Sequence, residues 1–274
     1  MSSLDTIAIP LANGERPATW GLNLNAFPQG QADLGKPFHD WKAKVMQILN
    51  GTGAYIYESA YLHVTASSPA PFTYAPLAEW KNEEKELYQE AWHAALKETC
   101  VVGAHPSWPS EPFPLTFKTL ELHASCAIFM VDDPQQGLRR IREAVAAAAE
   151  VVGRGAAGPL LARSGWKSPK IVHSTIMRLV APCSEGINVA ESWGRAAALW
   201  PAEGVTIMAH QMTFLKEVVP YQHLDPDPNS NEYVIDAFPY GPGSKPYDDV
   251  RRECFQPPSL CVTKQEKNKS SHIS

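Results

Sequence analysis

Two histidines of this chain are each followed, two residues later, by a threonine: His63 with Thr65, and His173 with Thr175. Both pairs lie in runs of apolar and β-branched residues, at 61–65 and 171–175, which are typical of β-strands. Alternate side chains of a strand share one face, so each imidazole should point the same way as its hydroxyl, with Cα atoms about 6.6 Å apart. Two such pairs facing each other would place two proton-transfer groups and two neutral hydrogen-bond donors around one small anion such as a phosphate.

A histidine two residues before a serine also occurs at His105, His123 and His272. His105 lies in a Pro- and Trp-rich loop and His272 in a polar tail, but His123 lies in a run at 120–131 that also has a strand pattern. Any one of these histidines taken alone is better explained as a structural residue. The pairing with threonine in matching contexts singles out His63 and His173, and we predict that His123 is structural.

These motifs, and the order of elements between them, resemble the two-histidine (2H) phosphoesterase superfamily, whose members carry two His-hydrophobic-Thr/Ser-hydrophobic motifs in two similar lobes. Residues 173–178, which read HSTIMR, are similar to the second motif and follow a long predicted helix and a Pro-containing approach at 168–170. Residues 63–66, HVTA, are similar to the first. The resemblance covers residues 53–238 and implies an α+β fold with two lobes, each an antiparallel sheet with helices on its outer face, and an active-site cleft between the lobes.

The resemblance also implies an activity: hydrolysis of a 2′,3′-cyclic phosphate on a nucleotide or an RNA end, as in RNA processing. In such a metal-independent phosphodiesterase, His63 and His173 would be the catalytic acid and base, in an order that the sequence leaves open. Thr65 and Thr175 would bind phosphate oxygens, and no cofactor or metal is implied. The alternatives are a 2′–5′ phosphodiesterase, a 3′ RNA-end trimming enzyme, an enzyme for a cyclic phosphate on ADP-ribose, an inactive nucleotide- or RNA-binding module, and a coincidental match in an unrelated scaffold.

Four further residues near the motifs are candidates for substrate binding. Tyr61 precedes the first motif, Trp166 could stack on a base, and Lys170 adds to a basic cluster around the second motif. The fourth candidate, Arg178, alternates to the face opposite His173 in a regular strand. Its match to the family therefore predicts a structural or inter-lobe salt bridge, while contact with substrate stays an alternative.

Composition predicts a compact intracellular protein. With 44% hydrophobic and 19% charged residues among 274, the chain is ordinary for a globular protein. It has no apolar run of membrane-spanning length, and its start lacks the pattern of a secretory signal, so we expect no membrane association and no secretion. The five cysteines are scattered without a Cys-x-x-Cys motif, which favours reduced thiols in the cytoplasm or nucleus and argues against zinc.

The formal net charge of −5 argues against binding to long DNA, so the expected partner is a nucleotide or a short RNA end, bound by a monomer. The Gly-x-Gly-x-x-Gly string at 153–158 follows a predicted helix rather than a strand, and it is predicted to end that helix. The string at 223–228, with two prolines, is predicted to be a turn and not a set of metal ligands.

Three regions are expected along the chain. Residues 1–52 form an N-terminal segment with one helix, residues 53–240 form the two-lobed domain, and residues 241–274 form an irregular extension with a disordered tail. Apolar spacing predicts helices at 37–50, 76–97, 138–152 and 186–199 and strands at 61–65, 170–180, 205–218 and 232–238, with one long strand or a hairpin at 117–131.

Overall fold

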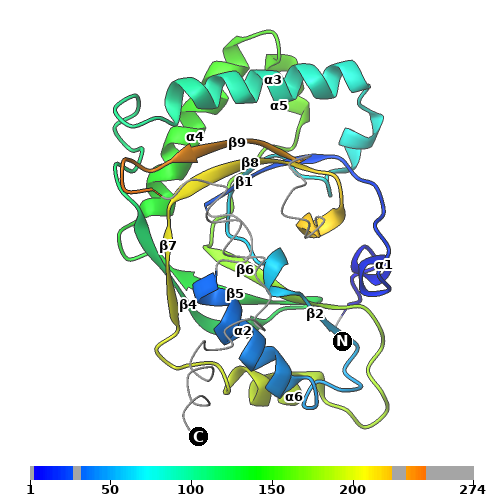
Figure 1. The fold of residues 1–274 in the computed structure, drawn as a ribbon. Coiled ribbons are helices and arrows are strands. Elements are labelled where there is room, and N and C mark those ends of the chain that lie inside the picture. Colours follow the sequence, from blue (N-terminus) through cyan, green and yellow to red (C-terminus); the bar gives the residue numbers. More distant parts are fainter. Residues whose placement is uncertain (1–2, 27–31, 224–232, 245–274) are drawn as a thin grey trace, which may run out of the picture.

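The strands form two antiparallel sheets in the computed structural model, which describes residues 3–26, 32–223 and 233–244 (Figure 1). The four-stranded sheet has the order β3-β1-β8-β9, and the five-stranded sheet has the order β2-β6-β5-β4-β7. The strands are β1 (Gly21–Asn25), β2 (Ala54–Ile56), β3 (Thr65–Ala70), β4 (Phe113–Leu122), β5 (Cys126–Asp132), β6 (His173–Leu179), β7 (Val205–Ala209), β8 (Gln211–Glu217) and β9 (Val234–Pro239).

Helices cover the outer side of each sheet (Figure 1). Over the four-stranded sheet, α3 packs on α4, and His93 of α3 lies 2.7 Å from the carboxylate of Asp236 in β9. Beneath the five-stranded sheet, the indole of Trp41 in α2 donates to the carbonyl of Ala196 in α6 at 2.9 Å. This arrangement confirms the prediction of a two-lobed α+β fold. The α-helices are α1 (Ala8–Ala12), α2 (Ala32–Val45), α3 (Asn82–Thr99), α4 (Gly137–Arg154), α5 (Gly158–Arg163) and α6 (Val189–Ala197), and the 3-10 helices are η1 (Ser59–Tyr61), η2 (Ala75–Glu79) and η3 (Pro220–Gln222).

An aromatic cluster fills the space between α2, α6 and the five-stranded sheet. Phe38 and Trp41, on the predicted apolar face of α2, are buried. The ring of Phe129 in β5 lies 6.2 Å from that of Phe38 and 4.6 Å from that of Trp200, measured between centroids. Each buried aromatic side chain contributes about 1.5–3 kcal/mol to stability, so this cluster stabilises the packing of α2 and α6 on the five-stranded sheet.

The two histidine motifs belong to different sheets. Thr65 opens β3 of the four-stranded sheet, and His173 opens β6 of the five-stranded sheet. The chain crosses directly between the sheets where β7 ends and β8 begins, with only His210 between them. The edge strand β7 of the five-stranded sheet therefore continues into the interior strand β8 of the four-stranded sheet, and each sheet contributes one motif.

Several local predictions from the sequence differ from the structure. The strand expected at 205–218 is divided into β7 and β8, which belong to different sheets, and the helix expected at 37–50 is α2, at 32–45. Residues 61–65 are not one strand, because η1 ends at Tyr61 and β3 begins only at Thr65. Residues 1–52, expected to carry one helix, contain α1, β1 and α2, and β1 lies between β3 and β8. The alternation of Leu22 and Leu24 with asparagine indicates this strand. The N-terminal segment thus supplies an interior strand of the first sheet.

The predicted bounds of the helix at 138–152 agree with those of α4. The carboxylate of Asp133 accepts hydrogen bonds from the backbone N–H groups of Gly137 and Leu138, both at 2.8 Å, and so starts α4. The glycine-rich string at 153–158 ends α4 and leads into α5, as predicted. Residues 224–228 of the predicted turn, and residues 245–274 of the predicted C-terminal extension, lie outside the described residues.

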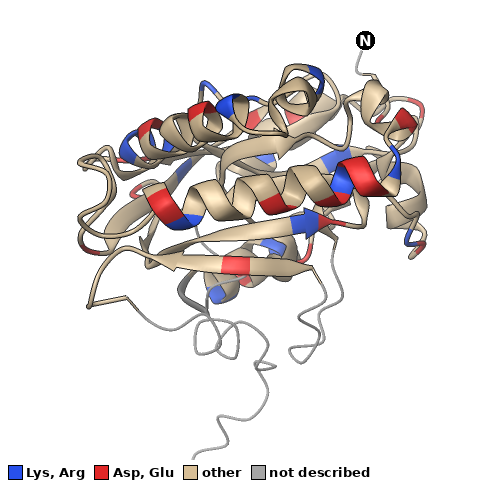
Figure 2. Cartoon of the chain, turned by 90° about the horizontal axis from the view of Figure 1, so that it is seen from above, with Lys and Arg blue, Asp and Glu red and all other residues tan. Residues whose placement is uncertain are grey.

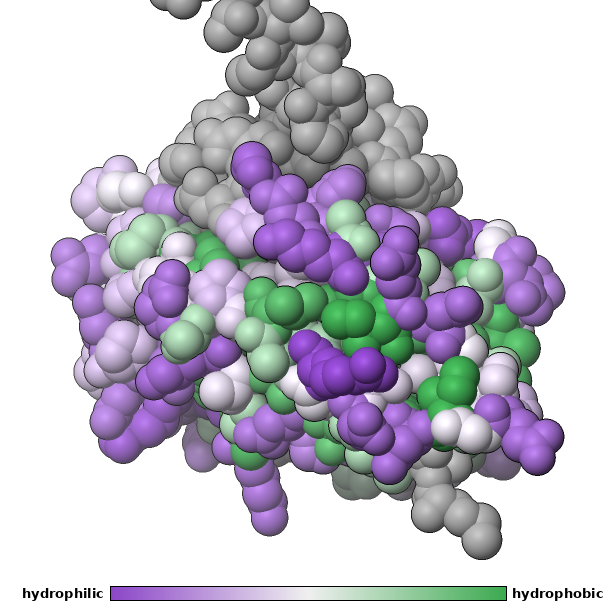
Figure 3. All heavy atoms as spheres, turned by 90° about the horizontal axis from the view of Figure 1, so that it is seen from below, coloured by the Kyte–Doolittle hydropathy of each residue, from purple (hydrophilic) through white to green (hydrophobic). Residues whose placement is uncertain are grey.

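The surface of the described residues is mixed in character. Acidic and basic residues are interspersed along the helices seen from above (Figure 2). From below, apolar side chains reach the surface in a central region surrounded by hydrophilic ones (Figure 3). No helix in the described part of the chain is long and apolar enough to cross a membrane.

Candidate active site

A cavity of about 670 Å³ lies between the two motifs. Both histidines and both threonines line it: His63, Thr65, His173 and Thr175. Three cationic side chains also line it, namely Lys167, Lys170 and Arg178. The residues that the sequence singled out for acid–base and anion-binding chemistry therefore meet in one place, although they come from different sheets.

His63 is held in one tautomer by the backbone. Its Nδ1 lies 2.8 Å from the carbonyl oxygen of Tyr61. Because a carbonyl can only accept, Nδ1 must carry the proton, which leaves Nε2 as a proton acceptor in the neutral ring. Burial lowers the pKa of His63 to about 4, and the nearby charges of His173 and Arg178 act in the same direction, while the hydrogen bond to Tyr61 opposes them. At neutral pH this ring is uncharged and suited to act as a base.

His173 has a related environment with a looser backbone contact. Burial lowers the pKa of His173, and the charge of Arg142 on α4 lowers it further. The backbone of Ile171 favours the charged ring, but the geometry at Nδ1 falls short of a hydrogen bond. The carbonyl of Ile171 instead accepts from Arg142 at 3.1 Å. The tautomer of His173 is thus less firmly set than that of His63.

A bulge in β6 brings Arg178 to the cavity. Ala127 of β5 pairs with Met177 and Ile128 pairs with Thr175, so Ile176 is an extra residue in β6. A bulge reverses the alternation of side chains beyond it. The prediction that Arg178 lies on the face opposite His173 is therefore wrong, and its guanidinium faces the same cavity.

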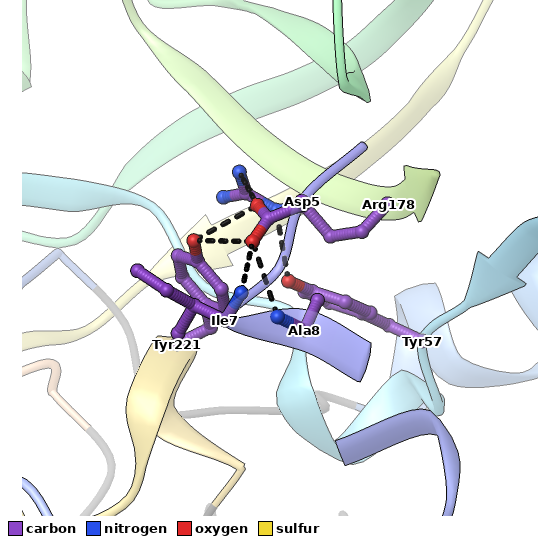
Figure 4. A network of polar contacts seen from close by, with 6 residues as sticks. All are labelled: Asp5, Ile7, Ala8, Tyr57, Arg178 and Tyr221. Carbon is purple, nitrogen blue, oxygen red and sulfur yellow. Dashed lines mark hydrogen bonds and ion pairs between the residues drawn. The ribbon is translucent and has the colours of Figure 1, made fainter. Parts of the chain in front are cut away.

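Arg178 is also the centre of a polar network that ties the N-terminal residues to both sheets (Figure 4). It forms an ion pair with Asp5 at 2.9 Å, donates to the hydroxyl of Tyr57 at 3.2 Å and stacks 4.0 Å above the ring of Tyr221. The hydroxyl of Tyr221 donates to Asp5 at 2.8 Å. The predicted structural salt bridge is confirmed, and these contacts leave the guanidinium at a set position in the cavity wall.

Arg142, on α4, connects the backbones of the two motifs. Its Nε donates to the carbonyl of Ala66 at 3.1 Å, and its Nη2 lies 3.4 Å from the carbonyl of Thr65 and 3.1 Å from that of Ile171. One planar guanidinium thus bridges β3 and the segment that enters β6. Burial lowers the pKa of Arg142.

The edge of β3 holds the basic segment in place. Ser68 and Lys167 exchange backbone hydrogen bonds of 2.8 and 3.2 Å, and the hydroxyl of Ser67 donates to the Lys167 carbonyl at 3.1 Å. Ser168 adds a hydroxyl contact of 3.2 Å to Ser67. Because residues 167–170 run along this edge, Lys167 and Lys170 reach the cavity.

The wall of the cavity on the four-stranded sheet is polar and buried. Glu217 accepts hydrogen bonds from the side chain of Asn23 and from the backbone N–H of Gln222, and Ser68 donates to Asn23 at 2.6 Å. Burial raises the pKa of Glu217 to about 8, although these hydrogen bonds oppose the shift. Asn25 is bonded to Gln222 at 2.6 Å. This wall therefore presents amides and a buried carboxyl group whose pKa is raised.

Two of the candidate substrate-binding residues do not line the cavity. The ring of Tyr61 packs 4.3 Å from that of His223, and its hydroxyl accepts from Arg16 at 2.9 Å. The indole of Trp166 donates to Ser67 at 3.1 Å, behind the edge of β3. His123 lies in the turn between β4 and β5, where its side chain is 48% exposed and its Nε2 is 3.8 Å from Glu121.

We did not predict roles for Arg142, Glu217 and Asn23 from the sequence, although the residues around each of them show an informative pattern. Arg142 falls on the apolar stripe of α4, at helical spacing from Leu138 and Val145, where a charge needs a partner. Asn23 alternates with leucine in residues 21–25, which indicates a strand with one polar face. Glu217 is a buried charge-bearing residue at the end of a strand of mostly buried residues. Within the described ranges, no group of three or more His, Cys, Asp or Glu side chains could hold a metal ion.

Comparison with known proteins gives only distant structural likenesses. No family model matches the chain, and no curated protein matches it. Solved structures do match: TT0787 of Thermus thermophilus, at 16% identity and a TM-score of 0.44, covers 81% of this chain and 99% of its own. E. coli LigT in its apo form, at 15% identity and a TM-score of 0.41, covers 73% of this chain and 88% of its own. At these values the likenesses say nothing about function, which must be argued from the cavity itself.

Replacing Arg142 with alanine should lower the free energy of unfolding by about 2–4 kcal/mol, because three carbonyls lose a charged donor. Arg139→Ala is the matched control, since Arg139 lies on the same helix and pairs with Glu143 at the exposed surface. That control should change stability by less than about 0.5 kcal/mol. Denaturant unfolding of both variants measures the difference, and equal effects would show that Arg142 does not join the motifs.

Proposed function

We propose that this protein is a metal-independent phosphodiesterase that hydrolyses a 2′,3′-cyclic phosphate on a nucleotide or an RNA end. The observation that carries the proposal is the convergence of His63, Thr65, His173 and Thr175 on one cavity. The similarity of both motifs to those of the 2H phosphoesterase superfamily supports the same function. The three cations that line this cavity match the negative charge of a phosphodiester.

The two histidines are suited to different roles. Water would attack phosphorus in line with the ribose oxygen that leaves, and Nε2 of His63 would take the proton of that water. His173, in its charged form, would give a proton to the departing ribose oxygen as the phosphorus–oxygen bond breaks. His63 then carries one proton more and His173 one fewer, and exchange with solvent restores both. His63 is assigned as the base because its Nδ1 is held as a donor to Tyr61.

The hydroxyls and cations would stabilise the charge that develops on the phosphate. No hydrogen bond to another described residue involves the hydroxyl of Thr65 or Thr175, so both are available to the non-bridging oxygens. Arg178 is anchored by Asp5 and Tyr57 and would supply a positive charge without reorganising. Preorganised donors of this kind supply a large part of catalysis in water-excluded sites.

Removing an imidazole should reduce turnover of adenosine 2′,3′-cyclic phosphate more than removing a hydroxyl. His63→Ala and His173→Ala each delete a proton transfer, worth about 10²–10⁴-fold. Thr65→Val and Thr175→Val each delete one hydrogen bond, worth about ten- to a hundredfold. Turnover of the four variants in excess chelator is the measurement, and we expect the chelator to change none of the rates.

His123→Ala is the control for these variants and should keep most of the wild-type turnover, because His123 does not line the cavity. A loss as large as that of His63→Ala would contradict the assignment. A parallel panel of a 2′–5′-linked dinucleotide, an RNA 3′ end and an ADP-ribose cyclic phosphate identifies the preferred ester. Binding of all of them without turnover would mean an inactive nucleotide-binding module.

The pH dependence of kcat/KM should be bell-shaped, with its maximum on the acidic side of neutrality. His63 must be neutral, and its pKa is lowered to about 4, so activity should fall as the pH drops through that value. His173 must be charged, and its pKa is lowered from 6.5. On the alkaline side, activity should therefore begin to fall at a pH below 6.5. His63→Ala should lose the acidic limb and His173→Ala the alkaline limb.

The profile of kcat should lie at higher pH than that of kcat/KM, because a bound phosphate favours both charged imidazoles. Initial rates of the wild type and the two variants, with chemistry shown to be rate-limiting, give both profiles. A profile that is flat between about pH 5 and 9 would mean that these imidazoles are not the acid and base.

A further inference from the structure

A second cavity of about 360 Å³ adjoins the first, and Phe72 lines both. On the side of the first cavity, the ring of Phe72 meets that of Tyr221 edge-on at 5.2 Å. The second cavity continues beyond Phe72 to Trp20, Tyr74 and Lys85. A ligand that extended from the phosphate site past Phe72 would therefore enter an aromatic chamber.

Two glycines lie directly against the aromatic residues Phe72 and Tyr74. A methyl group at Gly21 would lie 3.0 Å from Cβ of Phe72, and one at Gly165 would lie 2.6 Å from Cγ of Tyr74. Gly165 also has a φ of +68°, a value that favours glycine. Phe72 and Tyr74 thus each pack against the backbone of a glycine. Tyr74 is nevertheless 40% exposed.

The rest of the chamber combines an aromatic wall with one positive charge. Trp20 packs on Trp80 with ring centroids 5.9 Å apart, and Nζ of Lys85 lies 5.6 Å from the centre of the Trp20 ring. No carboxylate among the described residues forms an ion pair with Lys85. Alanine and leucine side chains of η2 complete the lining.

We propose that this second cavity binds the nucleobase of a nucleotide joined to the one that carries the reacting phosphate. The proposal rests on the proposed function and makes the substrate an oligonucleotide end rather than a mononucleotide. Every base has a flat face that stacks on aromatic side chains, and a lysine beside the stack attracts the linking phosphate. Thr19 and Lys85 are the main polar side chains of the lining, so the cavity should accept all four bases with little preference.

The test compares adenosine 2′,3′-cyclic phosphate with a diadenylate that ends in the same cyclic phosphate. The wild type should show a lower KM for the diadenylate. Tyr74→Ala should raise that KM by about five- to a hundredfold and leave the KM of the mononucleotide unchanged. Leu87→Ala is the matched control, because Leu87 is 42% exposed on α3 and lines neither cavity.

Lys85→Met keeps the length of the side chain and removes its charge. It should weaken the dependence of the diadenylate KM on salt and leave the mononucleotide KM unaffected. Equal KM values for the two substrates in the wild type, or an equal change of both in Tyr74→Ala, would overturn the base site.

The base site and the proposed function fail in different ways. If neither substrate is turned over, the proposed function is wrong. The proposed base site is then tested by calorimetry, which gives the dissociation constants of adenosine 2′-monophosphate and of a diadenylate with a terminal 2′-phosphate. If the wild type binds the diadenylate more tightly than the mononucleotide, and Tyr74→Ala removes this difference, the base site is supported. If the wild type binds the two nucleotides equally, the base site is overturned.

Discussion

One guanidinium, that of Arg142, holds the two halves of the site in register. The strands that carry the motifs, β3 and β6, belong to different sheets and do not pair with each other. Arg142 bridges them by donating to the carbonyls of Ala66 and Ile171, both at 3.1 Å. The position of His173 relative to Thr65 therefore depends on an arginine that touches neither side chain. Its charge also helps to keep the pKa of His173 low, so it links the geometry of the site to its electrostatics.

Irregularities in the strands complete the arrangement. The extra residue at Ile176 turns Arg178 toward the cavity, and the pairing of β1 with β3 shifts register twice between Thr65 and Ala70. Bulges of this kind re-aim side chains next to active sites. They also allow Thr65 and Ser68, three residues apart in β3, to line the same cavity, which regular alternation would forbid.

The fold class and the paired motifs could be predicted from the sequence, since apolar periodicity and residue spacing are local properties. The strand expected at 61–65 was wrong because a short 3-10 helix interrupts a run with strong β propensity, and tertiary packing can override propensity. The predicted orientation of Arg178 was wrong because a bulge cannot be recognised from a single sequence. The place of β1 between β3 and β8 depends on contacts with residues far along the chain, which periodicity does not report.

The central claim is that both histidines contact the same phosphate. It is tested most directly by following the imidazole resonances of His63 and His173 in a pH titration by NMR, with and without adenosine 2′-monophosphate. We expect one equivalent of nucleotide to raise the pKa values of His63 and His173 together, because a phosphate stabilises the charged ring. A rise at only one of the two rings, or at neither, would contradict it.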